Sequence, residues 1–188
     1  MSQPSERITK YLIIFIVGVI ILKGLTGSGF FESKTHKGRG FVASIPPGWK
    51  LVKKEKGVVY PRGVEIALFV PKGMDTEEKS PSIFISIYSK KLTTPIWVED
   101  EFPEILQSIS QSGFQIMDKG EIKVSGVISK WVVYHDKQTP ALALEFYLVT
   151  DNSIFYKLQY SAHPDQFNQN RAAFEFLKES FQLKFSLF

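Results

Sequence analysis

The sequence predicts an α+β fold, in which a central antiparallel β-sheet carries helices packed on it and is preceded by one N-terminal transmembrane helix. Three observations lead to this prediction. Most of the chain alternates apolar and polar residues, as half-buried strands do, whereas two segments repeat apolar residues at helical spacing. One uninterrupted apolar run lies near the start. The 188 residues leave room for one ordinary domain with its own core.

The apolar run at residues 11–22 reads YLIIFIVGVIIL and is bracketed by Lys10 and Lys23. As a helix it is about 18 Å long, shorter than the roughly 30 Å hydrocarbon core, but residues 8–26 nearly cross if both lysines reach the interfaces. A signal peptide and a buried core helix are the alternatives. A cleaved signal peptide is disfavoured because no Ala-x-Ala cleavage site follows the apolar run. A buried core helix is disfavoured because the segment is apolar on all sides and precedes a Gly-rich stretch.

We therefore divide the chain into a short tail at 1–10, a transmembrane anchor at 11–27, a linker at 28–39 and a globular domain at 40–188. A plain count of basic residues, with Arg7 and Lys10 before the anchor and three more after it, puts the domain in the cytoplasm. We expect it on the extracytoplasmic side, periplasmic or lumenal, because the first pair abuts the apolar run and long domains translocate despite later charges. The absence of cysteine suits an oxidising compartment.

The first part of the globular domain is predicted to form strands. Residues 41–45 alternate, and Pro46, Pro47 and Gly48 end that strand before a second one at 49–52. A turn at Lys56 and Gly57 predicts a hairpin with a strand at 58–60. The remaining strands expected here are 63–70 and 82–89.

The first predicted helix begins with Thr94 as its cap and Pro95 at its first position, and it ends at Gly113. Its apolar stripe comprises Trp97 or Val98, Phe102, Ile105, Leu106 and Ile109. The acidic residues Glu99, Asp100, Glu101 and Glu104 complement the helix dipole, which favours a solvated helix start over a metal site.

The second half is predicted to be a meander followed by a final helix. The strands expected are 114–119, 121–125, 127–135, 141–150 and 153–162, with the tightest turn at Asp151 and Asn152. The two long strands 141–150 and 153–162 form the centre of the sheet. A helix at 164–180 presents Phe167, Phe174, Leu177 and Phe181 to the core. Residues 183–188 close the chain as a short strand or tail.

The segment FVASIPPGW at 41–49, the mid-chain helix, the meander and the final helix ending in ESF at 179–181 together resemble the PsbP-like superfamily. That superfamily includes an extrinsic photosystem protein, a yeast Ran-binding import factor and bacterial envelope proteins. The resemblance covers about residues 40–185. It implies an α/β/α sandwich and a non-enzymatic binding or assembly module, and its aromatic and proline positions carry over as core and turn only.

The sequence offers few groups for catalysis. The histidines are His36, His135 and His163, and none has a second metal ligand at suitable spacing on its own element. A site assembled in space from His135, Asp136 and His163 is the alternative we consider. Nucleophile elbows and phosphate-binding glycine loops are missing from the sequence. We expect no catalytic, cofactor-binding or metal-binding residues, no cofactor and no enzymatic activity.

The charge argues against nucleic acid as a partner, because the net charge of +4 falls to near +2 once the leader is set aside. Lysines at 53, 54, 56, 90 and 91 are interpreted as solvated loop and strand-edge positions, with a small patch for anionic lipid or an acidic partner as the alternative.

We expect a membrane-anchored, non-catalytic interaction or assembly module that docks onto a larger membrane complex through protein partners. The alternative is a small-molecule or lipid-binding envelope protein, which the Phe content and the terminal Phe185, Leu187 and Phe188 favour. A hydrolase that depends on His135 or His163 ranks last.

Overall fold

The computed structural model describes residues 34–52, 64–74, 81–136 and 140–184. The predicted anchor at 11–27, the hairpin strand at 58–60, Lys53, Lys54 and Lys56, and the terminal Phe185, Leu187 and Phe188 lie outside these ranges. Within them, no helix is both long and apolar enough to cross a membrane.

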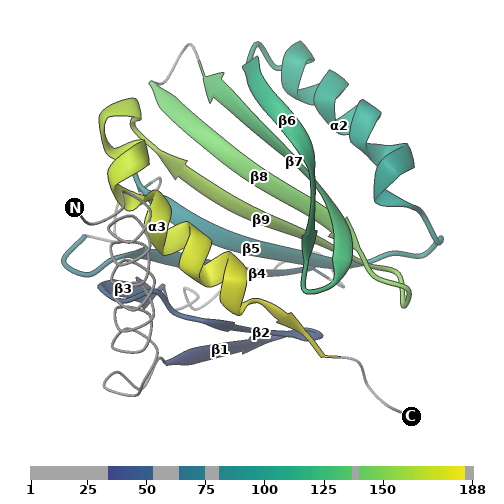
Figure 1. Ribbon diagram of the computed structural model, residues 1–188, viewed down its shortest axis with the longest axis horizontal. Helices are drawn as coiled ribbons and strands as arrows, with labels where there is room; N and C mark the ends of the chain where they lie inside the picture. The colour runs from purple at the N-terminus through teal and green to yellow at the C-terminus, as the bar shows by residue number, and fades with distance from the viewer. Residues whose placement is uncertain (1–33, 53–63, 75–80, 137–139, 185–188) are drawn as a thin grey trace, which may run out of the picture. The chain divides into compact units, whose positions relative to one another are not determined.

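The centre of the fold is a seven-stranded antiparallel sheet in the order β3-β4-β5-β9-β8-β7-β6 (Figure 1). Its strands are β3 Trp49–Leu51, β4 Val64–Pro71, β5 Phe84–Lys91, β6 Gln115–Val124, β7 Val127–Asp136, β8 Ala141–Val149 and β9 Ile154–Ala162. The strands β8 and β9 pair in the middle of the sheet, so the prediction that the two long strands form its centre is confirmed.

The two described helices, α2 (Val98–Gln111) and α3 (Pro164–Ser180), pack on opposite faces of this sheet. Alternation along β8 shows the two layers, because Phe146 and Leu148 join the cluster that contains α3 whereas Tyr147 joins the cluster that contains α2. In Figure 1, α2 runs beside β6 and β7, and α3 crosses the other side near β9. The predicted sheet with helices packed on it is therefore confirmed.

A second, three-stranded sheet consists of β1 Thr35–Gly38, β2 Phe41–Ser44 and β10 Gln182–Leu183. This corrects the predicted linker at 28–39, because residues 35–38 form a strand. The pairing partner explains the error, since each of these four residues faces a residue of β2. Their polar composition gave no strand signal, and the Phe41 ring lies so close over Gly38 that a Cβ there would meet it at 2.1 Å.

Helix α2 begins later than predicted. Its cap is Trp97, without a side-chain hydrogen bond, and its first residue is Val98, so Thr94 and Pro95 precede the helix. The predicted stripe is confirmed, with Val98, Phe102 and Ile109 buried against the sheet. Burial of that apolar face, more than a cap, determines where the helix lies.

The strand after α2 also differs from the prediction. Residues 115–124 form one strand with a register shift between Ile116 and Asp118, where two strands were expected. Its turn to β7 is the tightest in the described meander, with Ser125 and Gly126 between the paired Val124 and Val127 and both at positive φ. Asp151 and Asn152 instead lie in a longer connection, residues 150–153.

Helix α3 matches the prediction at both ends. It begins at Pro164, ends at Ser180, and buries Phe167, Phe174 and Leu177. Phe181 follows as the C-cap and is also buried, stacking on Phe41 of the small sheet with ring centroids 5.3 Å apart. The aromatic spacing read from the sequence therefore describes the packing of this helix correctly.

Candidate functional site

The three residues considered for a spatial site are not brought together as a metal centre. His135 on β7 pairs with Leu142 on β8, and Leu142 pairs with Ala162 on β9, the residue before His163. At ordinary strand spacing, the backbones of His135 and Ala162 are therefore about 10 Å apart. The Nδ1 atom of His163 accepts a hydrogen bond from the Asp165 N–H at 3.4 Å and so caps α3. No group of three or more metal-ligating side chains occurs in the described ranges.

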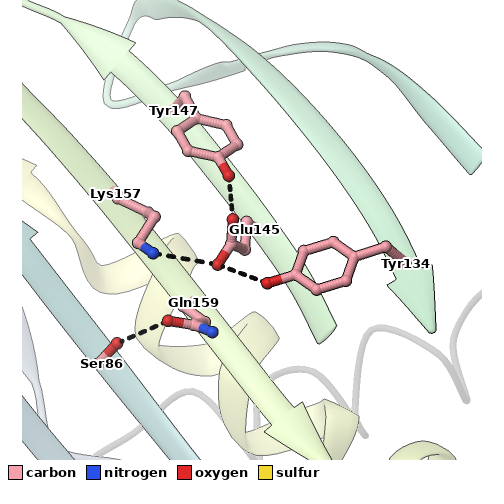
Figure 2. Close-up of polar contacts among 6 residues, drawn as sticks. All are labelled: Ser86, Tyr134, Glu145, Tyr147, Lys157 and Gln159. Atoms are coloured by element: carbon pink, nitrogen blue, oxygen red, sulfur yellow. Dashed lines mark hydrogen bonds and ion pairs between the residues drawn. The ribbon is translucent and has the colours of Figure 1, made fainter. Parts of the chain in front are cut away.

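A different polar cluster lies on the α2 side of the sheet, around Glu145 in the central strand β8 (Figure 2). Its side chain is 3% exposed. The Oε1 atom accepts hydrogen bonds from the Tyr134 hydroxyl at 3.0 Å and from the Lys157 Nζ at 3.1 Å. The Oε2 atom accepts one from the Tyr147 hydroxyl. A buried carboxylate thus has three donors, as burial of a charge requires.

Strand register explains why these four residues meet. Glu145 pairs with Val132 on β7 and with Gln159 on β9, so Tyr134 and Lys157 each lie one diagonal step away on the same face. Tyr147 is two residues further along β8 and shares that face. The sequence did not predict this cluster. One feature of the sequence could have indicated it: a single Glu lies inside the apolar strand ALALEFYLV. Since charged residues are rarely buried without partners, this Glu predicts polar side chains on the neighbouring strands.

A second polar contact continues the cluster across the sheet. Gln159 lies beside Glu145 on β9, and its Oε1 accepts a hydrogen bond of 3.5 Å from the Ser86 hydroxyl on β5. Figure 2 shows this hydrogen bond next to the three contacts of Glu145. The polar side chains of Ser86, Gln159 and Glu145, from three neighbouring strands, therefore lie in one row on the α2 face.

The cluster borders a cavity of about 260 Å³, widely open to solvent, between the C-terminal half of α2 and the sheet. The sheet contributes the polar residues Tyr134, Glu145, Tyr147 and Lys157 to its lining. Ser108 of α2 and Ser112, the C-cap of that helix, complete the polar part. The apolar part of the lining is Ile105, Ile109 and Phe114. The Phe114 ring stacks on Tyr134, with ring centroids 5.2 Å apart.

The electrostatics favour binding over acid–base chemistry. Burial raises the pKa of Tyr134 and of Tyr147 far above the usual range, and the nearby Glu145 charge raises it further. Both phenols therefore remain protonated donors at neutral pH. The carboxylate is enclosed and already accepts three hydrogen bonds, so it is poorly placed to take a proton from a substrate. The arrangement can orient polar groups at the cavity floor.

Fold and site together define an α/β/α sandwich with a polar cavity beside one helix. No protein-family model matches the sequence, and no curated protein matches it. Among solved structures, the chain is similar to cyanobacterial PsbP (CyanoP) of Synechocystis sp. PCC 6803, with 13% identity, a TM-score of 0.53, and coverage of 84% of this chain and 95% of that one.

Two further solved structures are similar. A protein of Bacteroides thetaiotaomicron VPI-5482 has 11% identity and a TM-score of 0.53, over 83% of this chain and 50% of that one. LpqN of Mycobacterium tuberculosis, described as involved in cell envelope biogenesis, has 12% identity and a TM-score of 0.50, over 82% and 86%. The domain has the PsbP-like fold, as the segment at 41–49 and the order of elements predicted; identities this low show the fold alone.

Proposed function

We propose that this chain is a membrane-tethered, non-catalytic interaction module that docks onto, or helps to assemble, a larger complex at a membrane surface. The observation that carries the non-catalytic part is the engagement of Glu145. This carboxylate, buried in the centre of the sheet, is held by two phenols that stay protonated and by an ammonium group. Such a cluster stabilises and orients, and its carboxylate is not free to act as a base at the cavity.

The membrane part of the proposal rests on the apolar sequence at residues 11–22. A tether confines the domain close to membrane partners and so raises their effective concentration without any new contact. We propose the extracytoplasmic side for the domain, on the arrangement of charges around this segment.

The exposed Trp97 is the side chain we assign to docking. It is 67% exposed at the start of α2, where its backbone carbonyl accepts a hydrogen bond from Asp100. Tryptophan is enriched among the residues that dominate binding energy at protein interfaces. An indole held this far out of the core, on an ordered helix start, is available to a partner protein.

The docking test is extraction of native membranes with a mild detergent, followed by native electrophoresis and mass spectrometry. We expect the full chain to comigrate with other membrane proteins. Consistent migration as a lone monomer contradicts the proposal.

The tether is tested by changing Phe15→Lys and Val19→Lys in the full chain. Each charge at the centre of a span costs about 2.5–3.5 kcal/mol of insertion free energy, so the double variant should leave the membrane fraction under an alkaline wash. As a control, Ser2→Lys and Ser5→Lys add the same charge before the apolar run and should leave the protein in the membrane. Equal release of the unchanged protein and the double variant contradicts the tether.

A second candidate function is a small-molecule-binding envelope protein, which the cavity beside α2 favours. A concave site with converging polar side chains is a typical ligand site. Its floor of Glu145, Lys157 and two tyrosine hydroxyls is polar, which favours a polar molecule over a lipid chain. Native mass spectrometry of the purified protein tests for a copurifying ligand.

A further inference from the structure

We propose that the cavity between α2 and the sheet binds a small neutral molecule rich in hydroxyl groups, such as a single sugar ring or a cyclic polyol. This proposal deepens the second candidate function and rests on it. It follows from the charges, the hydrogen-bonding capacity and the size of the cavity.

The charges on the cavity floor favour a neutral ligand. The charges of Lys157 and Glu145 cancel one another, because the Lys157 Nζ and Glu145 Oε1 atoms are 3.1 Å apart. An anion that approached the ammonium would also meet the Glu145 carboxylate, and a cation drawn to the carboxylate would meet Lys157. Both charged classes therefore meet a like charge in a partly desolvated site, where repulsion is stronger than in water.

The remaining hydrogen-bonding capacity matches hydroxyl groups. An ammonium has three N–H donors, and Lys157 uses one of them on Glu145. The Tyr134 and Tyr147 hydroxyls donate to Glu145, so their oxygens keep lone pairs that can accept. At the rim, the Ser112 hydroxyl donates to the Ser108 carbonyl, and its oxygen can likewise accept. Donors and acceptors thus lie side by side, and a hydroxyl group serves as both.

The shape and size of the cavity favour one ring. Its volume of about 260 Å³ is just below the roughly 300–1,000 Å³ of sites for drug-sized ligands. Phe114, stacked on Tyr134, lines the cavity with an apolar aromatic ring next to the polar floor. A sugar ring or cyclic polyol likewise has an apolar and a polar part, with C–H groups on its faces and hydroxyls around its edge.

The test uses the full chain, purified in a detergent that has no sugar headgroup. Glucose and myo-inositol are the neutral probes, and acetate and ethylammonium are the charged ones, all measured by saturation-transfer NMR and calorimetry. Ser108→Trp, at an exposed helix position on the rim, fills the cavity without changing the buried cluster. Gln107→Trp, at the neighbouring exposed position outside the lining, is the matched control.

We expect saturable binding of at least one neutral probe, at least tenfold weaker binding of both charged probes, at least tenfold weakening in Ser108→Trp and no change in Gln107→Trp. Thermal unfolding of both variants checks that each is folded. The proposal is overturned if neither neutral probe binds saturably, if a charged probe binds as tightly, or if both tryptophan variants behave alike. Comigration of Ser108→Trp with membrane proteins reports separately on docking, so failure of the cavity and failure of the proposed complex are distinguishable.

Discussion

The Nζ atom of Lys157 lies 3.1 Å from the Oε1 atom of Glu145, one diagonal step across the two central strands of the sheet. The lysine side chain is 30% exposed and the glutamate 3%. The lysine therefore reaches from the cavity, where water has access, to a carboxylate that water does not reach. The partner of this buried charge thus comes from the strand beside it, and the same ammonium faces the cavity.

Replacing Lys157 should lower the stability of the folded protein. Lys157→Met leaves the buried carboxylate without its cation, and we expect the free energy of unfolding to fall by about 2–3 kcal/mol, less than for a fully buried pair because Lys157 is partly solvated. Urea unfolding of the full chain measures it. As the control, Lys130→Met removes the cation beside Glu121, which is 52% exposed, and should cost less than about 1 kcal/mol.

A double variant shows whether Lys157→Met destabilises the protein through the uncompensated charge of Glu145 or through lost packing of the lysine side chain. Glu145→Gln with Lys157→Met has no buried charge: its amide oxygen accepts from one tyrosine hydroxyl, and its amide N–H₂ donates to the oxygen of the other. It should therefore recover at least about 1 kcal/mol relative to Lys157→Met alone. Equal stability of the double variant and Lys157→Met would show that Lys157 acts through packing.

Stability should fall at alkaline pH because of the buried tyrosines. Burial raises the pKa of Tyr156 and of Tyr160 to about 12, and it raises the pKa of Tyr134 and Tyr147 further. In the unfolded chain all four ionise near pH 10. Their stabilising contribution is therefore complete below about pH 10 and is lost as pH rises towards the folded values, by up to about 1.4 kcal/mol per tyrosine and pH unit.

Urea midpoints measured between about pH 8 and pH 11, with tyrosinate absorbance as the second signal, check this dependence. Tyr156→Phe should lessen the decline, because phenylalanine has no hydroxyl to ionise. A midpoint that stays constant across the range would contradict the prediction.

Gly120 on edge strand β6 faces the Trp131 ring on β7. A Cβ added at Gly120 would lie 2.7 Å from Trp131 Cζ2, so one of the two must move. We expect Gly120→Ala to lower the free energy of unfolding by about 1–3 kcal/mol, the usual cost of overpacking. Combined with Trp131→Phe, which shortens the ring, the alanine should cost less than it does alone. Additive effects of the two changes would argue against this contact.

Trp97 should matter for association and not for folding. Because its side chain is 67% exposed, Trp97→Ala should change the free energy of unfolding by less than about 0.5 kcal/mol. Loss of an interface anchor of about 2 kcal/mol weakens binding roughly 30-fold, so comigration in native membranes should decline strongly. Met117→Ala, at a residue 57% exposed on β6, is the control and should leave comigration intact. Equal comigration of Trp97→Ala and the unchanged chain would remove Trp97 from the docking surface.

Local patterns predicted most elements of this fold. The apolar stripe of α2 and the aromatic spacing of α3 identify both helices because helical periodicity depends only on nearby residues. The start of α2 was misplaced at Thr94, because packing of Val98 and Phe102 on the sheet outweighs a local capping signal. The single strand β6 was divided in two, since its bulge shifts the alternation at Ile116.

The amino-acid sequence by itself determined the fold class, the central pair of strands and the two helices, because these follow from patterns within a dozen neighbouring residues. Tertiary structure decided what short-range patterns do not contain. It made a strand of residues 35–38 by pairing them with β2, and it surrounded Glu145 with Tyr134 and Lys157 from the strands on either side. Both depend on the register between strands, which brings together residues that local periodicity cannot relate.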